Sequence, residues 1–217
     1  YFVSPDGTTN VLGTQLYAPT TLGSAMARVV TDDVIVLRGG TYRTGNLEVN
    51  QGVTLQPYAD EQPVLKGTQV ATHWEALRDH VWRTKWTPLF PEKPAPWWRR
   101  EREGMRTPLC HFNNDMVFVD GRALQSASWE GELNSNNFSI DYDDGYVFLG
   151  FNPSNHVIEI TAQASAIVRT VKDVHGKNND HQGLIIRGLT FTQYAYRALE
   201  VDGTEPEDPA DPATFGK

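Results

Sequence analysis

The sequence predicts an all-β solenoid of stacked parallel strands, with one short helix near the N-terminus and an inserted antiparallel β-rich segment. Short β-rich runs separated by turn residues occupy residues 34–67 and return in residues 158–201. Related runs are one solenoid coil apart, because Val34 and Val53 are 19 residues apart and Ile167 and Ile185 are 18 apart. Between the two blocks the composition changes, and all six tryptophans fall there.

The first expected element is a short helix within residues 18–30. Thr20 or Thr21 could cap its N-terminus, since a threonine hydroxyl can accept a hydrogen bond from a free amide of the first turn. Apolar residues recur behind this cap at helical spacing: Leu22, Ala25, Met26 and Val29. The segment therefore predicts a helix with one buried face.

The coil strands are expected in two groups. The first group is VIVL at 34–37, NLEV at 46–49, VTLQ at 53–56 and PVLKG at 63–67. The second group is IEI at 158–160, AIVRTV at 166–171, GLIIRGLTF at 183–191 and ALEV at 198–201. Because side chains alternate along a strand, we expect Ile185, Leu189 and Phe191 to face inward and Arg187 and Thr190 to face outward. Ile167 and Ile185 should lie one above the other.

The segment 68–156 predicts an antiparallel β insertion. It contains the hairpin-like stretches MVFVDGRAL and FSIDYDDGYVFLG, and an Asp-Gly turn between alternating strands is a strong hairpin signal. The predicted organisation is a cap with first coils at 1–67, the inserted domain at 68–156 and resumed coils at 157–217.

Several stretches together resemble a known family. YFVSPDGT, DDVIVLRGGTYR and VTLQPY resemble the N-terminal cap and first coils of right-handed parallel β-helix proteins, especially secreted carbohydrate-active ones. MVFVDGRAL, the DYDDGYVFLG hairpin and GLIIRGLTF resemble β-helix glycoside hydrolases that carry an inserted β domain. The resemblance covers nearly all of the chain and implies a right-handed parallel β-helix. It is weak for the reaction, because the matching stretches are architectural.

The resemblance implies an extracellular or periplasmic enzyme acting on a polysaccharide, by hydrolysis with two carboxylates. In this family the catalytic carboxylates lie on outward positions of later coils. A last coil with an open apolar interior needs a cap or further repeats. We therefore expect the chain to be an N-terminal portion, with the remaining coils supplied by the same longer protein or by a second chain.

Composition excludes some partners. The formal net charge of -8 argues against general affinity for nucleic acid or anionic membranes. No apolar run approaches the roughly 20 residues of a membrane span. Cys110 is the only cysteine, so an intrachain disulfide is impossible. The expected partner is a polysaccharide or oligosaccharide.

The stretch PAPWWRRERE is the first candidate for substrate binding. Flat aromatic faces stack on sugar rings and arginines bind hydroxyls or carboxylates, which favours Trp97, Trp98, Arg99 and Arg100 as a sugar platform. The alternative is that the tryptophans pack the insertion and that the arginines pair with the neighbouring glutamates.

The stretch FTQYAYRALEVDG is the second candidate. Glu200 and Asp202 are two residues apart on an expected strand, so both face one side, as a carboxylate pair for glycoside hydrolysis could use. Neighbours on one strand would more naturally repel each other or bind one cation, since catalytic carboxyls flank the scissile bond. Tyr194 and Arg197 are candidates for lining a substrate groove.

Two further stretches suggest metal sites and favour ordinary turns. DYDDG at 141–145 could bind calcium, but it lacks the spacing of an EF-hand loop. VHGKNNDHQG contains His175, Asp180 and His181 without a third ligand at diagnostic spacing. No metal or other cofactor is therefore predicted, and calcium remains an option without a specific motif.

Two alternatives to a hydrolase stay open. A polysaccharide lyase would remove a proton next to a uronate with a base and a charge-neutralising group. A non-catalytic surface or matrix protein would use the solenoid as a rigid scaffold and the insertion to bind a partner. Two outward carboxylates across a groove would favour the enzyme.

Overall fold

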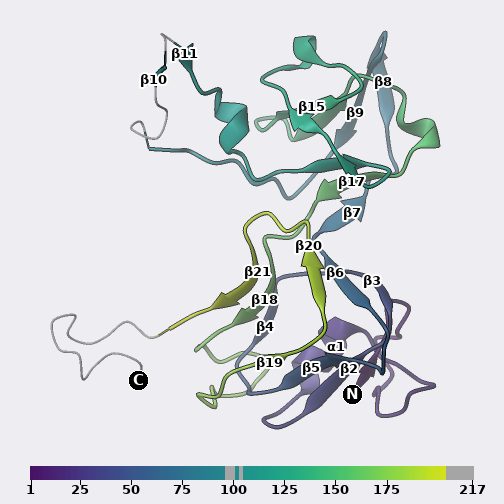
Figure 1. Ribbon diagram of the computed structural model, residues 1–217, viewed down its shortest axis with the longest axis vertical. Coiled ribbons are helices and arrows are strands. Elements are labelled where there is room, and N and C mark those ends of the chain that lie inside the picture. Colours follow the sequence, from purple (N-terminus) through teal and green to yellow (C-terminus); the bar gives the residue numbers. More distant parts are fainter. Residues whose placement is uncertain (96–100, 103–104, 204–217) are drawn as a thin grey trace, which may run out of the picture. The chain divides into compact units, whose positions relative to one another are not determined.

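The computed structural model of the chain describes residues 1–95, 101–102 and 105–203, with the backbone alone for 101–102 and 105–106. The regular secondary structure of the described part is mainly β-strand, with one α-helix (Figure 1). The chain divides into two compact units, one made of Tyr1–Gly67 with Ser165–Lys217 and the other of Thr68–Ala164.

The first unit contains three sheets in which every strand pair is parallel. The first sheet has the order β1 (Phe2–Val3), β2 (Val34–Leu37), β5 (Thr54–Pro57) and β19 (Ile185–Ile186). The second sheet has the order β3 (Gly40–Arg43), β6 (Pro63–Lys66) and β20 (Thr190–Thr192). The third sheet has the order β4 (Leu47–Val49), β18 (Ser165–Arg169) and β21 (Arg197–Val201). From β2 onward, the strands of this unit enter the three sheets in a repeating order.

The core of the first unit is built from rows of side chains at equivalent positions of neighbouring strands. Ile35 and Leu55 are paired in register and completely buried, and Ile186 continues their row as a partly buried residue. In the second sheet the corresponding row is Tyr42, Leu65 and Phe191. The period-two alternation of each strand puts the intervening residues on the opposite face.

Two predictions about these rows are wrong. Ile167 lies in β18 between Leu47 and Leu199, whereas Ile185 lies in β19 opposite Thr54, so the two isoleucines do not stack. Side chains stack in a row only when their strands belong to the same sheet. Ile167 and Ile185 are 18 residues apart but lie on strands of different sheets, so they belong to different rows. Ile185 is 46% exposed, and the inward residue of its strand is Ile186. The inward placement of Leu189 and Phe191 is confirmed, because both pack against the core.

The predicted N-terminal helix is confirmed as α1 (Leu22–Arg28). The Thr21 hydroxyl oxygen accepts a hydrogen bond from the Ser24 amide at 3.2 Å, which caps the first turn. Leu22, Ala25 and Met26 are buried in the core of the first unit.

The second unit contains a four-stranded and a five-stranded sheet. The four-stranded sheet has the order β13 (Arg122–Ala123), β12 (Val117–Val119), β17 (Ile158–Thr161) and β7 (Thr68–Val70). The five-stranded sheet has the order β14 (Gln125–Ser126), β15 (Asn137–Asp141), β16 (Tyr146–Leu149), β9 (Val81–Lys85) and β8 (Glu75–Arg78). The remaining elements are β10 (Glu101–Arg102), β11 (Met105–Arg106) and the 3-10 turns η2 (Leu109–Phe112), η3 (Glu130–Glu132) and η4 (Pro153–Asn155).

This unit differs from the expected insertion in two ways. Its pairing is largely antiparallel, but β14 and β15 pair in parallel. Residues 158–160 were expected among the resumed coils, whereas β17 pairs with β12 and β7 inside the second unit. The core of this unit is apolar and includes Val117, Phe138, Val147, Leu149 and Ile160.

The strands β19, β20 and β21 are terminal strands of their sheets in the described part of the chain. On β21, Leu199 pairs with the buried Ile167 and Val201 pairs with the buried Arg169. Leu199 is nevertheless 45% exposed and Val201 is 77% exposed. This sheet edge therefore presents apolar side chains to solvent.

Within the described ranges, no helix has the length and apolar character needed to cross a membrane.

Candidate functional site

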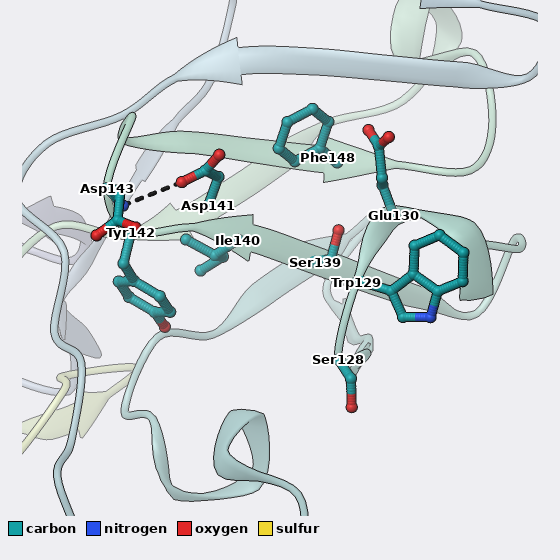
Figure 2. A pocket seen from close by; sticks show the side chains of 9 residues that line it. All are labelled: Ser128, Trp129, Glu130, Ser139, Ile140, Asp141, Tyr142, Asp143 and Phe148. Atoms are coloured by element: carbon teal, nitrogen blue, oxygen red, sulfur yellow. Dashed lines mark hydrogen bonds between the residues drawn. The ribbon is translucent and has the colours of Figure 1, made fainter.

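A cleft with a volume of about 520 Å³ opens in the second unit (Figure 2). It is formed by the β15–β16 hairpin and by the segment that leads into η3. Its lining combines aromatic, hydroxyl and carboxylate side chains: Ser128, Trp129, Glu130, Ser139, Ile140, Asp141, Tyr142, Asp143 and Phe148.

The hairpin provides the floor of the cleft. The predicted Asp-Gly turn is confirmed, because Asp141 pairs with Tyr146 across it and Gly145 adopts a positive φ of 64°. The Asp141 Oδ1 atom accepts hydrogen bonds from the amides of Asp143 and Asp144, both at 3.0 Å. Asp141 therefore shapes the turn, which fixes one wall of the cleft.

Trp129 provides the largest exposed aromatic surface of the cleft. Its side chain is 61% exposed, although a tryptophan normally buries most of its surface. A Cβ atom at Gly131 would lie 2.1 Å from the Trp129 Cη2 atom, so the indole rests against the glycine backbone. The glycine thus allows the ring to lie close to η3.

Glu130, the residue that follows Trp129, contributes a carboxylate to the lining of the cleft. Its Oε1 atom is 2.9 Å from the Arg78 Nη2 atom, and both side chains are partly exposed. A partly exposed ion pair of this kind contributes little to stability. In Figure 2, Glu130 and Trp129 lie at one end of the cleft and Asp141 and Asp143 at the other.

The Ser139 hydroxyl is the unusual polar group of this cleft. Ser139 is 2% exposed, and its Oγ atom has no hydrogen-bond partner among the described residues. Ser139 is paired with Phe148, so the two side chains share one face of the sheet. A buried hydroxyl without a partner costs about 1–3 kcal/mol, so Ser139 lowers the stability of the sheet beneath the cleft surface.

Tyr142 is held in place by a buried carboxyl group. Its hydroxyl donates to Asp115 Oδ2 at 2.9 Å, and the Phe90 amide donates to the same oxygen at 2.9 Å. Burial raises the pKa of Asp115 above its ordinary value, although these two hydrogen bonds oppose the shift. Burial also raises the pKa of Tyr142, which therefore stays neutral. The arrangement orients Tyr142 at the cleft wall.

The cleft can bind a ring that carries several hydroxyl groups. An exposed indole can stack on the apolar face of such a ring, while carboxylates and hydroxyls can bind its edge. Glu130 and Asp141 are engaged with Arg78 and with turn amides, so their visible role is positioning.

The predicted platform Trp97, Trp98, Arg99 and Arg100 lies outside the described residues. The structure adds nothing to that prediction.

The candidates in the stretch FTQYAYRALEVDG differ in accessibility, from the buried Tyr194 to the exposed Arg197. Tyr194 is 8% exposed and its hydroxyl donates to the Thr44 carbonyl at 2.8 Å, so a substrate could not reach its ring. The Arg197 Nη1 atom is 3.1 Å from Glu200 Oε1, and the Ser165 hydroxyl donates to Glu200 Oε2 at 3.2 Å. The Asp202 amide donates to the Arg169 carbonyl, which continues the pairing of β21 with β18.

The residues weighed as metal ligands have other contacts. Asp180 Oδ1 pairs with Arg169 at 2.9 Å, and the His175 ring contacts the Glu48 carbonyl at 3.1 Å. His181 is exposed and its ring contacts the Asn179 side chain. Across the described ranges, no group of three or more histidine, cysteine or acidic side chains is placed to hold a metal ion.

The cleft itself was not predicted from the sequence. Trp129 was counted among the tryptophans of the insertion, and DYDDG was interpreted as a turn. The available signal was Trp129 next to two glutamates and one glycine in the stretch WEGE. Only the folded unit brings that stretch to the hairpin.

Comparison with known proteins gives a fold relationship. No protein family matches the chain, and no curated protein matches its sequence. A solved structure described as "The complex structure of XylC with xylose" matches with a TM-score of 0.64 and 14% identity, over 91% of this chain and 36% of that one. A structure described as "Glycoside hydrolase" matches with a TM-score of 0.48 and 14% identity, over 89% of this chain and 50% of that one. The chain thus spans about a third of the first protein and half of the second.

Proposed function

We propose that the chain is part of a secreted carbohydrate-active protein and that the cleft of Figure 2 binds a saccharide. The observation that carries this proposal is the Trp129 indole, which is 61% exposed in a cleft that is also lined by Ser128 and by carboxylates such as Glu130. A sugar ring offers an apolar face to the indole and hydroxyl groups to the polar atoms.

The proposed architecture is a right-handed parallel β-helix with an inserted β-rich domain. It is supported by three parallel sheets that the chain enters in a repeating order. The solved structure that resembles this chain, XylC, was determined with xylose, which supports a saccharide as the ligand to test. Xylose-containing oligosaccharides are therefore the first ligands to test.

The proposed activity of the whole protein is glycoside hydrolysis on a polysaccharide, with two carboxylates acting on an outward face of the helix. Of the predicted catalytic candidates, Glu200 is held by Arg197 and Ser165, and it remains a proposal together with Asp202. The remaining coils would come from the same longer protein or a second chain, and the exposed Leu199 and Val201 would pack against them.

A binding protein without catalysis is the second candidate. It is favoured by the contacts of the cleft carboxylates, since Glu130 pairs with Arg78 and Asp141 accepts two turn amides. Incubating the whole protein with the bound saccharide and measuring reducing ends separates the two, because only an enzyme releases product.

Calorimetric titration with xylo-oligosaccharides tests the binding proposal. Trp129→Ala should weaken binding by about 2 kcal/mol, the loss typical of a tryptophan hot spot. The matched control is Tyr17→Ala, which removes an 84% exposed aromatic ring of the first unit. Equal affinities of the two variants, or no binding by any form of the protein, would refute the proposal.

A further inference from the structure

A second cleft, with a volume of about 440 Å³, lies in the second unit where β8 begins and β9 ends. Its lining includes the cationic residues Arg83 and Lys85, the aromatic residues Trp74 and Tyr146, and Glu75. None of these residues lines the cleft described above.

The two cations are fixed by one aromatic ring. Arg83 and Lys85 are two residues apart on β9, so they project from the same face, and Lys85 is paired with Tyr146 of β16. The Arg83 Cζ atom lies 4.4 Å from the Tyr146 ring centroid, and the Lys85 Nζ atom lies 4.7 Å from it. Such cation–π contacts reduce the freedom of both side chains before any ligand arrives.

Among the residues that line the cleft, two cations, Arg83 and Lys85, stand beside one carboxylate, Glu75. The Glu75 Oε1 atom is 2.5 Å from the Arg83 Nε atom and balances that charge. The Lys85 ammonium donates to the Asp144 carbonyl, and in the described part of the chain no carboxylate makes an ion pair with it. The Lys85 ammonium is exposed and contacts a carbonyl instead of a carboxylate, so an anionic ligand can reach it.

We propose that this cleft binds the carboxylate of an acidic saccharide such as a uronate. Lys85 would meet the ligand carboxylate, while Trp74 and Tyr146 supply aromatic surface next to it. Glu75 can accept hydrogen bonds from sugar hydroxyls, and it would repel a dianionic phosphate more strongly than a single carboxylate. The identification of the ligand as a saccharide rests on the proposed function. The charge argument for an anionic ligand is independent of it.

The strand register relates the two clefts. Asp141 is paired with Tyr146 and Phe148 with Arg83, so these four side chains, two from each cleft, project from one face of the five-stranded sheet. Neighbouring strands are separated by about 4.8 Å, which is close to the length of one sugar ring. One oligosaccharide with an acidic unit could therefore contact both clefts.

Titration with a matched pair of ligands tests the proposal. The probes are a uronic acid trisaccharide and its carboxyl-reduced neutral counterpart, measured by calorimetry at low salt. The variant Lys85→Gln removes the ammonium, and the control Lys93→Gln removes an exposed lysine elsewhere in the same unit. Tryptophan emission of each variant verifies that the unit is folded.

The acidic trisaccharide should bind about tenfold more tightly than the neutral one, and Lys85→Gln should remove most of that preference while Lys93→Gln retains it. Added salt should reduce the preference as well. Equal affinities for both probes, no binding of the acidic probe, or the same preference in both variants would overturn the proposal.

Trp129→Ala separates this inference from the proposed function. If Trp129→Ala weakens binding of neutral xylo-oligosaccharides while Lys85→Gln leaves the acid preference unchanged, only the acidic site is refuted. If the acid preference depends on Lys85 while Trp129→Ala has no effect on neutral oligosaccharides, only the first cleft is refuted.

Discussion

Removing the Asp180 carboxylate should destabilise the first unit strongly. Arg169 stands in an interior row between Val49 and Val201, and its side chain is 8% exposed. Its Nη2 atom is 2.9 Å from Asp180 Oδ1, and its Nε atom donates to the Gln182 carbonyl at 2.8 Å. The other Asp180 oxygen accepts from the Gly52 amide and the Thr31 hydroxyl, both at 2.6 Å.

The size of the effect follows from burial. Burial alone would raise the pKa of Asp180, but hydrogen bonds from Thr31, Gly52 and Gln182 and the charge of Arg169 lower it below its ordinary value. The folded unit therefore stabilises the ionised carboxylate. Breaking a buried pair by removing one partner costs about 3–5 kcal/mol, because the other charge stays buried. Asp180→Ala should lower the free energy of unfolding of the first unit by that amount.

Urea unfolding followed by two signals measures the effect in the correct unit. All six tryptophans lie between residues 68 and 164, so tryptophan emission reports the second unit, whereas circular dichroism reports both. Asp180→Ala should move the circular dichroism transition to lower urea and leave the emission transition unchanged. The control Asp173→Ala, an exposed carboxylate of the same loop, should stay within about 0.5 kcal/mol of the natural chain. Similar shifts for both variants would refute the reasoning.

Three more predictions concern the core, the pH dependence and the cleft. Leu55→Ala should lower the free energy of unfolding in urea by about 2–5 kcal/mol, because Leu55 is fully buried. A loss no larger than that of Thr41→Ala, which changes an exposed residue, would contradict the placement of Leu55 in the interior row with Ile35. Burial raises the pKa of the Asp115 carboxyl in the folded protein above its unfolded value of about 3.9. The protonated carboxyl therefore makes its full contribution to stability when the pH is below the unfolded pKa, and that contribution is lost as the pH rises through the folded pKa. Asp115→Asn should flatten that pH dependence, measured by tryptophan emission during unfolding, and an unchanged slope would exclude Asp115 as its source. Gly131→Ala should displace the Trp129 ring and weaken oligosaccharide binding in calorimetry, and full affinity would show that the ring position is unimportant.

The features that were predicted correctly depend on local chemistry. Thr21 caps α1 because its hydroxyl reaches an amide three residues away. The Asp144-Gly145 turn forms a hairpin because the glycine tolerates a positive φ. Each of these signals lies within a few residues of the element that it specifies.

The features that were missed depend on distant pairing. Ile167 faces Leu47 and Leu199, and the sequence does not show which earlier strand a later one joins after an insertion of about a hundred residues. Trp129 becomes a cleft residue only because the unit brings WEGE beside the hairpin. Periodicity thus predicted the parallel strands but not their register or the cleft.

The most direct test of the account locates a bound oligosaccharide on the chain. Amide chemical shifts should be recorded by NMR during titration with a xylo-oligosaccharide. The account predicts that the perturbed signals cluster at residues 128–130, 139–143 and 148, which line the cleft around Trp129. Perturbations confined to residues 194–202, or no perturbation at saturating ligand, would contradict it.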